Sequence, residues 1–303
     1  MKNFFKLIFL GNFFIGLLAI VLSIESNVQL RLPLNSVGYY ILLFCVTVYY
    51  YTYAYVGPLF STTYSNPRTE WYRKNSVFIK WSQRILLTLS IALSFYLLYK
   101  NFYSITHLAS IYWIIISVVI IAALLYYGLL PRSFYKINLR NTGWLKSFVI
   151  GFVWACCANL LSFIFLQIEK GEHNVDPILL IWLFVKNWMF CTVNAIMFDI
   201  KDYAHDSNVE LKTFVVRFGL RKTIYFILLP LIIIGLISLL AFTSAHHFSY
   251  ITISINLLPF IFLLMIAWSM LRPHKIMYYL VIIDGLIFFK AICGIVGMQF
   301  INR

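Results

Sequence analysis

Long apolar runs are the feature that most constrains how this chain can fold. A helix that crosses a bilayer needs about 20 predominantly apolar residues, and the 303-residue sequence contains nine such runs joined by polar links. The runs are too long, and alternate too little, for the strands of a membrane barrel. We therefore predict nine transmembrane helices, over residues 4–24, 38–57, 85–99, 106–130, 147–168, 178–198, 223–242, 250–271 and 276–300.

Composition supports a membrane protein and excludes several other classes. Charged residues make up 11% of the chain and apolar residues 62%, whereas about a quarter of an average soluble domain is charged. A soluble enzyme, a disordered tail and a nucleic-acid-binding domain are therefore excluded. The net charge of +14 is assigned to loops that face anionic lipid. No linker or composition change divides the chain, so we expect one all-α domain over residues 1–303, with the lipid bilayer as a partner.

The distribution of lysine and arginine predicts the orientation. With the N-terminus inside, the cytoplasmic segments carry 18 of the 24 basic residues, and the external segments carry four. Cytoplasmic loops of membrane proteins are enriched in these residues. We expect a cytoplasmic N-terminus and an external C-terminus, in a bacterial inner membrane or an organelle membrane.

An acidic cluster follows the sixth apolar run. Four of the ten acidic residues, Asp199, Asp202, Asp206 and Glu210, lie within twelve positions in the stretch FDIKDYAHDSNVELKT. Spacings of three and four place the first three on one face if the helix continues. Carboxylates near a helix C-terminus repel each other and the helix dipole, so a positive group should offset them. Carboxylate oxygens suit Mg²⁺. The alternative is a solvated acidic loop that pairs with its own basic residues.

The cluster resembles a motif of the UbiA-type superfamily of intramembrane prenyltransferases, which includes 4-hydroxybenzoate polyprenyltransferases. Members have a DxxDxxxD motif at the cytoplasmic end of the sixth helix, as in Asp199–Asp206 here. A Lys-Thr-Phe step and an Arg-Phe-Gly step follow in this chain at 212–214 and 217–219. The resemblance implies nine transmembrane helices around a central cavity that opens to the cytoplasm, and a place in the biosynthesis of quinones or related prenylated compounds.

The chain departs from the family at a second motif. The family's NDxxDxxxD motif should end the second helix, but no acidic residue lies between Glu25 and Glu70. The expected positions fall near residues 54, 57–58 and 61–62. In the family the two motifs face each other across the cavity and hold a diphosphate through Mg²⁺, so half of that site has no counterpart here.

The resemblance implies transfer of a prenyl group from an allylic diphosphate to an aromatic or other lipophilic acceptor. It assigns Asp199, Asp202 and Asp206 as Mg²⁺ ligands and catalytic residues. The candidates for diphosphate contact are Arg68, Arg140 and Lys212.

Charges within the apparent spans leave other functions open. Lys186, Asp284 and Lys290 lie inside apolar runs, where charged groups usually face a cavity or a partner. Asp284 is a candidate to line the cavity and to meet Lys186. Two alternatives to an enzyme remain: a catalytically silent homologue that binds an isoprenoid or a partner protein, and a small transporter. Transporters often contain internal repeats, and no convincing repeat is present.

Overall fold

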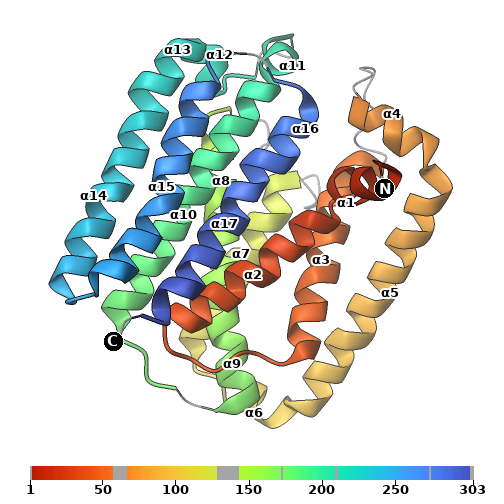
Figure 1. Ribbon diagram of the computed structural model, residues 1–303. Coiled ribbons are helices and arrows are strands. Elements are labelled where there is room, and N and C mark those ends of the chain that lie inside the picture. Colours follow the sequence, from red (N-terminus) through yellow and green to blue (C-terminus); the bar gives the residue numbers. More distant parts are fainter. Residues whose placement is uncertain are drawn as a thin grey trace.

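The computed structural model describes residues 2–56, 67–127, 143–171, 173–208, 211–272 and 274–300, and these form a bundle of helices (Figure 1). The described residues contain no strand, so the all-α prediction is confirmed for them. The elements, in which η marks a π-helical segment, are α1 Lys2–Leu10, α2 Phe13–Gln29, α3 Val37–Val56, α4 Pro67–Lys74, α5 Ser76–Lys100, α6 Phe102–Thr106, α7 Ser110–Tyr127, α8 Leu145–Ala155, η4 Cys156–Leu161, α9 Ser162–Lys170, α10 Pro177–Lys201, α11 Tyr203–Asn208, α12 Phe214–Phe218, α13 Leu220–Thr223, η5 Ile224–Leu228, α14 Leu229–Ala245, α15 Tyr250–Ser269, α16 Ile276–Tyr278, η6 Tyr279–Ile283 and α17 Asp284–Met298.

Six helical rods among the described residues are long and apolar enough to cross a membrane. A seventh is added if the bent pair α1–α2 counts as one span. The predicted spans at 38–57 and 106–130 correspond to shorter apolar helices, Val37–Tyr53 and Ser110–Tyr126. The chain is therefore a candidate integral membrane protein with at least six potential spans, and the full set of nine stays a prediction.

The first predicted span is wrong in its shape. In place of one helix over 4–24, α1 and α2 meet at an angle of 63°. Asn12 has the left-handed backbone conformation, with φ of 64°, which ends one helix and starts the next. Helix α2 then continues to Gln29, past the charged residue Glu25.

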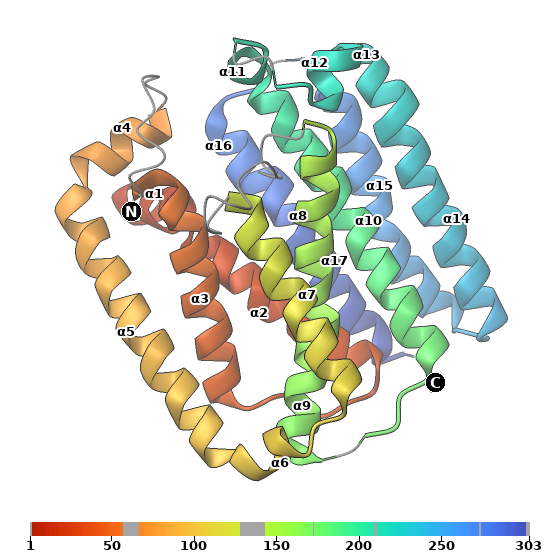
Figure 2. The same cartoon turned by 180° about the vertical axis from the view of Figure 1, so that it is seen from behind.

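The core lies where α2, α10, α14, α15 and α17 pack together. In Figure 1 these helices stand close together, and α5 lies at the outer edge beside α3. Seen from behind, α7 runs along α8 (Figure 2). Only 17% of the apolar window of α5 is buried. Its outer face carries exposed Leu87, Ile91 and Phe95, as expected of a helix that faces lipid.

The two ends of the bundle are distinguished by the elements that lie there. Helices α10 and α17 run in opposite directions, and α11 and α12 cover the end at which α10 finishes (Figure 1). We call this the acidic end, because Asp199, Asp202 and Asp206 lie there. The turn between α14 and α15 lies at the opposite end.

Candidate functional site

Asp199 is buried at the acidic end and already has two partners. Helix α8 packs along α10 and brings Lys146 and Ser147, at the start of α8, to this carboxylate. The Lys146 ammonium lies 2.8 Å from Asp199 Oδ1, and the Ser147 hydroxyl donates to Oδ2 over 2.6 Å. Each carboxylate oxygen is therefore engaged by the chain itself.

Asp206 reaches the same lysine from α11. Its Oδ2 lies 3.8 Å from Lys146 Nζ, and this buried oxygen has no hydrogen-bond partner in the structure. Burial raises the pKa of Asp206 to about 7; Lys146 opposes this shift, while the charges of Asp199 and Asp202 add to it. Lys146 therefore stands between two motif carboxylates.

Asp202 does not join this pair. Helix α10 ends at Lys201, and Asp202 is its C-cap residue, so the helix does not continue through the motif as the one-face prediction required. The Asp202 side chain is 41% exposed and pairs with Lys201 at 3.2 Å. Among the described residues, no three Asp, Glu, His or Cys side chains are grouped to hold a metal ion. The arrangement therefore does not fit the three-carboxylate Mg²⁺ site that the family resemblance implies.

Two of the three candidate diphosphate contacts, Arg68 and Lys212, lie in the part of the chain that the structure describes. Arg68 is buried, donates to Leu10 O at 3.3 Å and to Asn12 Oδ1, and lies over the Tyr55 ring at 4.4 Å from its centroid. It thus braces the bend between α1 and α2. Lys212 is exposed at the surface. Arg140 and the region of the missing motif at 57–62 lie outside the described residues.

Asp284 does not meet Lys186, so the predicted pairing of these two residues is wrong. Asp284 is buried at the start of α17, within electrostatic range of Arg68 and Lys201. It makes no hydrogen bond or ion pair among the described residues. The π-helical segment η6 ends immediately before it, and Asn194 of α10 donates to the carbonyl of Ile283 over 3.3 Å.

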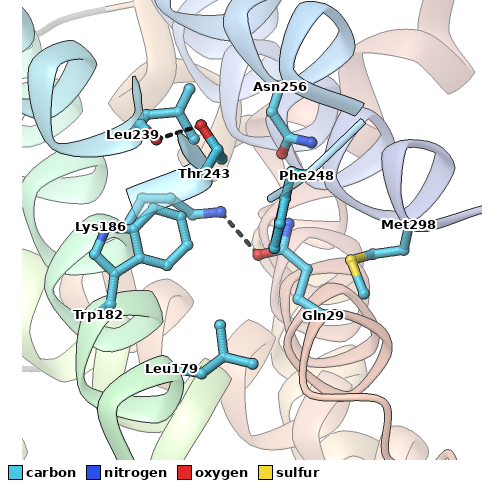
Figure 3. Close-up of a pocket in the computed structure, with 9 residues that line it drawn as sticks. All are labelled: Gln29, Leu179, Trp182, Lys186, Leu239, Thr243, Phe248, Asn256 and Met298. Carbon is cyan, nitrogen blue, oxygen red and sulfur yellow. Dashed lines mark hydrogen bonds between the residues drawn. The ribbon is translucent and has the colours of Figure 1, made fainter. Parts of the chain in front are cut away.

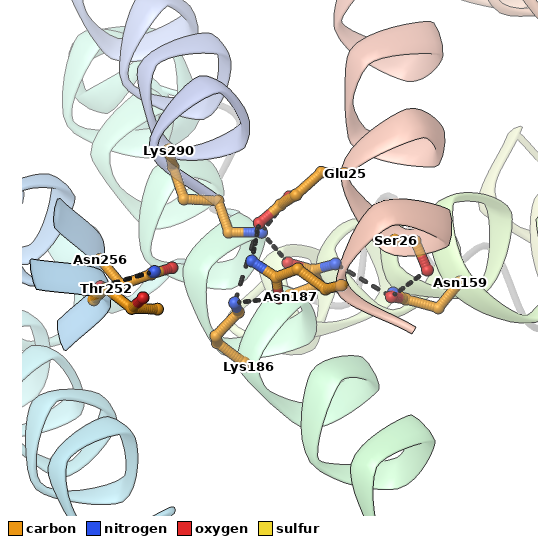
Figure 4. Close-up of polar contacts among 9 residues, drawn as sticks. Glu25, Ser26, Asn159, Lys186, Asn187, Thr252, Asn256 and Lys290 are labelled. Carbon is orange, nitrogen blue, oxygen red and sulfur yellow. Dashed lines mark hydrogen bonds and ion pairs between the residues drawn. The ribbon is translucent and has the colours of Figure 1, made fainter. Parts of the chain in front are cut away.

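A second cluster of charged side chains lies nearer the start of α10, among α2, α10 and α17, and we call it the buried charge network. Glu25 of α2 is completely buried. The ammonium of Lys290 lies 2.7 Å from Glu25 Oε2, and that of Lys186 lies 3.7 Å from Oε1 (Figure 4). Two ammonium groups thus face one carboxylate. Lys186 and Asp199 both lie on α10, and at the helical rise of 1.5 Å per residue they are about 20 Å apart.

Neutral amides complete the buried charge network. Gln29 donates to Glu25 Oε1 over 3.2 Å and accepts from Lys186 at 2.8 Å. Lys290 donates to Asn187 Oδ1, and Asn187 donates to Asn159 Oδ1 over 3.1 Å. These bonds place side chains of α2, η4, α10 and α17 in one connected set.

Local sequence makes room for this set. Residue 294 is a glycine, and a Cβ there would collide with the Glu25 carboxylate and the Gln29 amide. Asn159 lies in the π-helical segment η4, a type of irregularity that is frequent at functional sites.

A small hollow touches the network on the side toward the opposite end. It measures about 10 Å³ and is lined by Lys186, Gln29, Asn256 and Trp182, among others (Figure 3). A hollow of this size is about the minimum for one water molecule. The Lys186 ammonium also lies 4.9 Å from the centre of the Trp182 ring.

A larger apolar groove lies between α7, α8 and α10. Its volume is about 340 Å³, and its lining includes Ala122, Leu145, Phe148, Val149 and Trp188. Leu145 is the neighbour of Lys146 in the chain, so one end of the groove lies beside the lysine that pairs with Asp199 and Asp206. Trp188 donates to the carbonyl of Phe148 over 2.9 Å, which joins two walls of the groove.

Sequence reasoning missed Glu25 and Lys146. The first predicted span stops at residue 24, directly before Glu25, although Gln29 lies four residues later and places two polar groups on one helix face. Lys146 is one of the basic residues of the predicted cytoplasmic segments, and the sequence assigns it no carboxylate partner.

Comparison with protein-family models, with curated proteins and with solved structures finds no significant match. The resemblance to the UbiA-type superfamily therefore rests on the motif residues alone.

Proposed function

We propose that this chain is a membrane-embedded prenyltransferase of the UbiA type, which binds an isoprenoid diphosphate and transfers its prenyl group to a lipophilic acceptor. One observation carries the proposal: a charged cluster and a 340 Å³ apolar groove adjoin at Leu145 and Lys146. An isoprenoid diphosphate has the same two parts, a charged head and an apolar chain.

The groove has the properties that a chain-binding site needs. Ligand pockets usually measure about 300–1,000 Å³ and are mostly apolar with few polar groups. The lining of this groove is apolar or aromatic throughout. Two of its walls belong to the helical segments Leu145–Lys170 and Pro177–Lys201, which are long enough to cross a membrane, and the third is the shorter apolar helix α7, so a lipophilic chain can reach it from the bilayer.

The charged head would lie at the acidic end. Negative charge that develops on a leaving diphosphate is stabilised by preorganised positive groups, and the mostly buried Lys146 follows directly on Leu145 of the groove lining. Arg140 and Lys212 remain candidate contacts from the predicted cytoplasmic side. Mg²⁺ is implied only by the family resemblance. The described residues do not form the three-carboxylate site, so no catalytic step is assigned to the metal.

A silent homologue that binds an isoprenoid without reaction is the second candidate. The observation that favours it is the pairing of Asp199 with Lys146 and Ser147, since a carboxylate with both oxygens engaged is less available for catalysis. The missing first motif favours it as well.

Binding of a labelled allylic diphosphate to the protein in nanodiscs tests the proposal, with Mg²⁺ and with chelator. We expect saturable binding that is lost in Ala122→Trp, because the new ring fills the groove. Ile237→Trp is the matched control, because Ile237 is an exposed residue of α14 away from the groove. Equal binding by both variants, or no binding by folded wild type, contradicts the proposal. Prenyl transfer to an acceptor then separates the enzyme from the silent homologue.

A further inference from the structure

We propose that Lys146 takes the place of a divalent cation between Asp199 and Asp206, so that the acidic motif binds no Mg²⁺ while this lysine is present. The inference concerns the motif of the proposed function, but it does not depend on isoprenoid binding, and its test contains no isoprenoid.

Both carboxylate oxygens of Asp199 already have a partner from the chain itself. Lys146 and Ser147 engage its two oxygens at 2.8 Å and 2.6 Å. Mg²⁺ requires oxygen ligands at about 2.0–2.1 Å in near-octahedral geometry. A metal bound to Asp199 would therefore compete with the ammonium of Lys146, whose side chain is only 13% exposed.

A second carboxylate, that of Asp206, also lies near the Lys146 ammonium. It comes from a different helix, yet its Oδ2 is directed at Lys146 over 3.8 Å. This oxygen is buried and has no hydrogen bond. Among the described residues its ion pair is with Lys146, and the charge of Lys201 acts on Asp206 as well. One cation between two carboxylates is the arrangement in which a metal ion would be expected.

Charge explains why the lysine and the metal exclude each other. When both carboxyl groups are ionised, they and the one ammonium leave a net charge of −1, and an added Mg²⁺ would lie within ion-pair distance of the ammonium. Like charges at that separation repel strongly in a buried site. Removal of the ammonium leaves both carboxylates uncompensated, and a divalent cation can then replace it.

The experiment measures Mn²⁺, a spectroscopic substitute for Mg²⁺, by the loss of its free electron paramagnetic resonance signal on addition of protein in nanodiscs. We expect no motif-dependent binding by wild type and about one bound Mn²⁺ per chain in Lys146→Met. Adding Asp199→Asn to that variant should abolish the bound ion. Lys201→Met is the matched control. It also removes a lysine from an ion pair with a motif carboxylate, but that carboxylate, on Asp202, is 41% exposed and has no ion pair with Lys146 among the described residues, so no site should appear.

Two results overturn the inference. One is Mn²⁺ binding by wild type that Asp199→Asn removes, and the other is a folded Lys146→Met variant that binds no more Mn²⁺ than wild type. The wild-type comparison stands even if Lys146→Met does not fold. Failure of either arm leaves the isoprenoid experiment unaffected, so the two proposals can fail separately.

Discussion

Glu25→Gln is the perturbation that the buried charge network makes most informative. The substitution keeps the shape of the side chain and removes its negative charge. Glu25 has no exposed surface, and it lies 2.7 Å and 3.7 Å from the ammonium groups of Lys290 and Lys186. The variant would leave two buried ammonium groups facing each other with no carboxylate between them.

We expect a large loss of unfolding free energy from this nearly isosteric substitution. Removing one partner of a buried ion pair typically costs about 3–5 kcal/mol, because a buried charge is left uncompensated. Both lysines are more than nine-tenths buried, so water does little to offset this loss. We expect Glu25→Gln to lower the free energy of unfolding by about 3–5 kcal/mol.

Unfolding by SDS in mixed micelles measures this free energy. Asp176→Asn is the control, because Asp176 is an exposed N-cap that accepts from Ile178 N over 2.9 Å, and Asn caps a helix equally well. We expect its effect to stay within about 0.5 kcal/mol. Lys186→Met should cost less in the Glu25→Gln background than in wild type, since it then relieves repulsion. A loss below about 1 kcal/mol in Glu25→Gln, or additive effects of the two substitutions, would refute the reasoning.

Three further predictions concern other parts of the chain. Burial raises the pKa of Asp206 to about 7, so its contribution to stability is fully present below about pH 4 and is lost as the pH rises through 7. Asp206→Asn should therefore flatten unfolding free energy against pH between 4 and 8, and an unchanged profile would contradict the assignment. Gly294→Ala should cost about 1–3 kcal/mol by overpacking against Glu25, whereas Gly285→Ala, with open space around its Cβ position, should be neutral or stabilising in the same SDS assay. Arg68→Met should expose the bend between α1 and α2 to faster backbone hydrogen exchange, and unchanged exchange at residues 10–13 would show that Arg68 does not brace it.

Hydropathy predicts where the helices lie, but it does not predict where they bend or change to π-helical geometry. Each predicted apolar run falls largely on helical residues, because a run of about 20 apolar residues has few other ways to satisfy its backbone in a membrane. The break at Asn12 was missed because it depends on contacts with Arg68, which lies 56 residues away. The π-helical segments likewise carry no pattern in the sequence.

The candidate site stays a prediction, and the structure adds the partners of its carboxylates, which the sequence did not predict. Spacing placed Asp199 and Asp206 near one another, but which cation lies between them depends on how α8 packs on α10. That packing selected Lys146, which composition could not distinguish from other loop lysines. Glu25 was missed because a charge at the edge of an apolar run is ordinarily taken as the end of a span.

Photolabelling tests the central claim most directly. The probe is an isoprenoid diphosphate with a diazirine near the chain terminus, crosslinked to the protein in nanodiscs and mapped by mass spectrometry. The account predicts labels on residues 118–125 of α7 and 145–152 of α8, removed by excess unlabelled donor. Labels on the lipid-facing surfaces of α5 or α14, or labels that unlabelled donor does not displace, would contradict it.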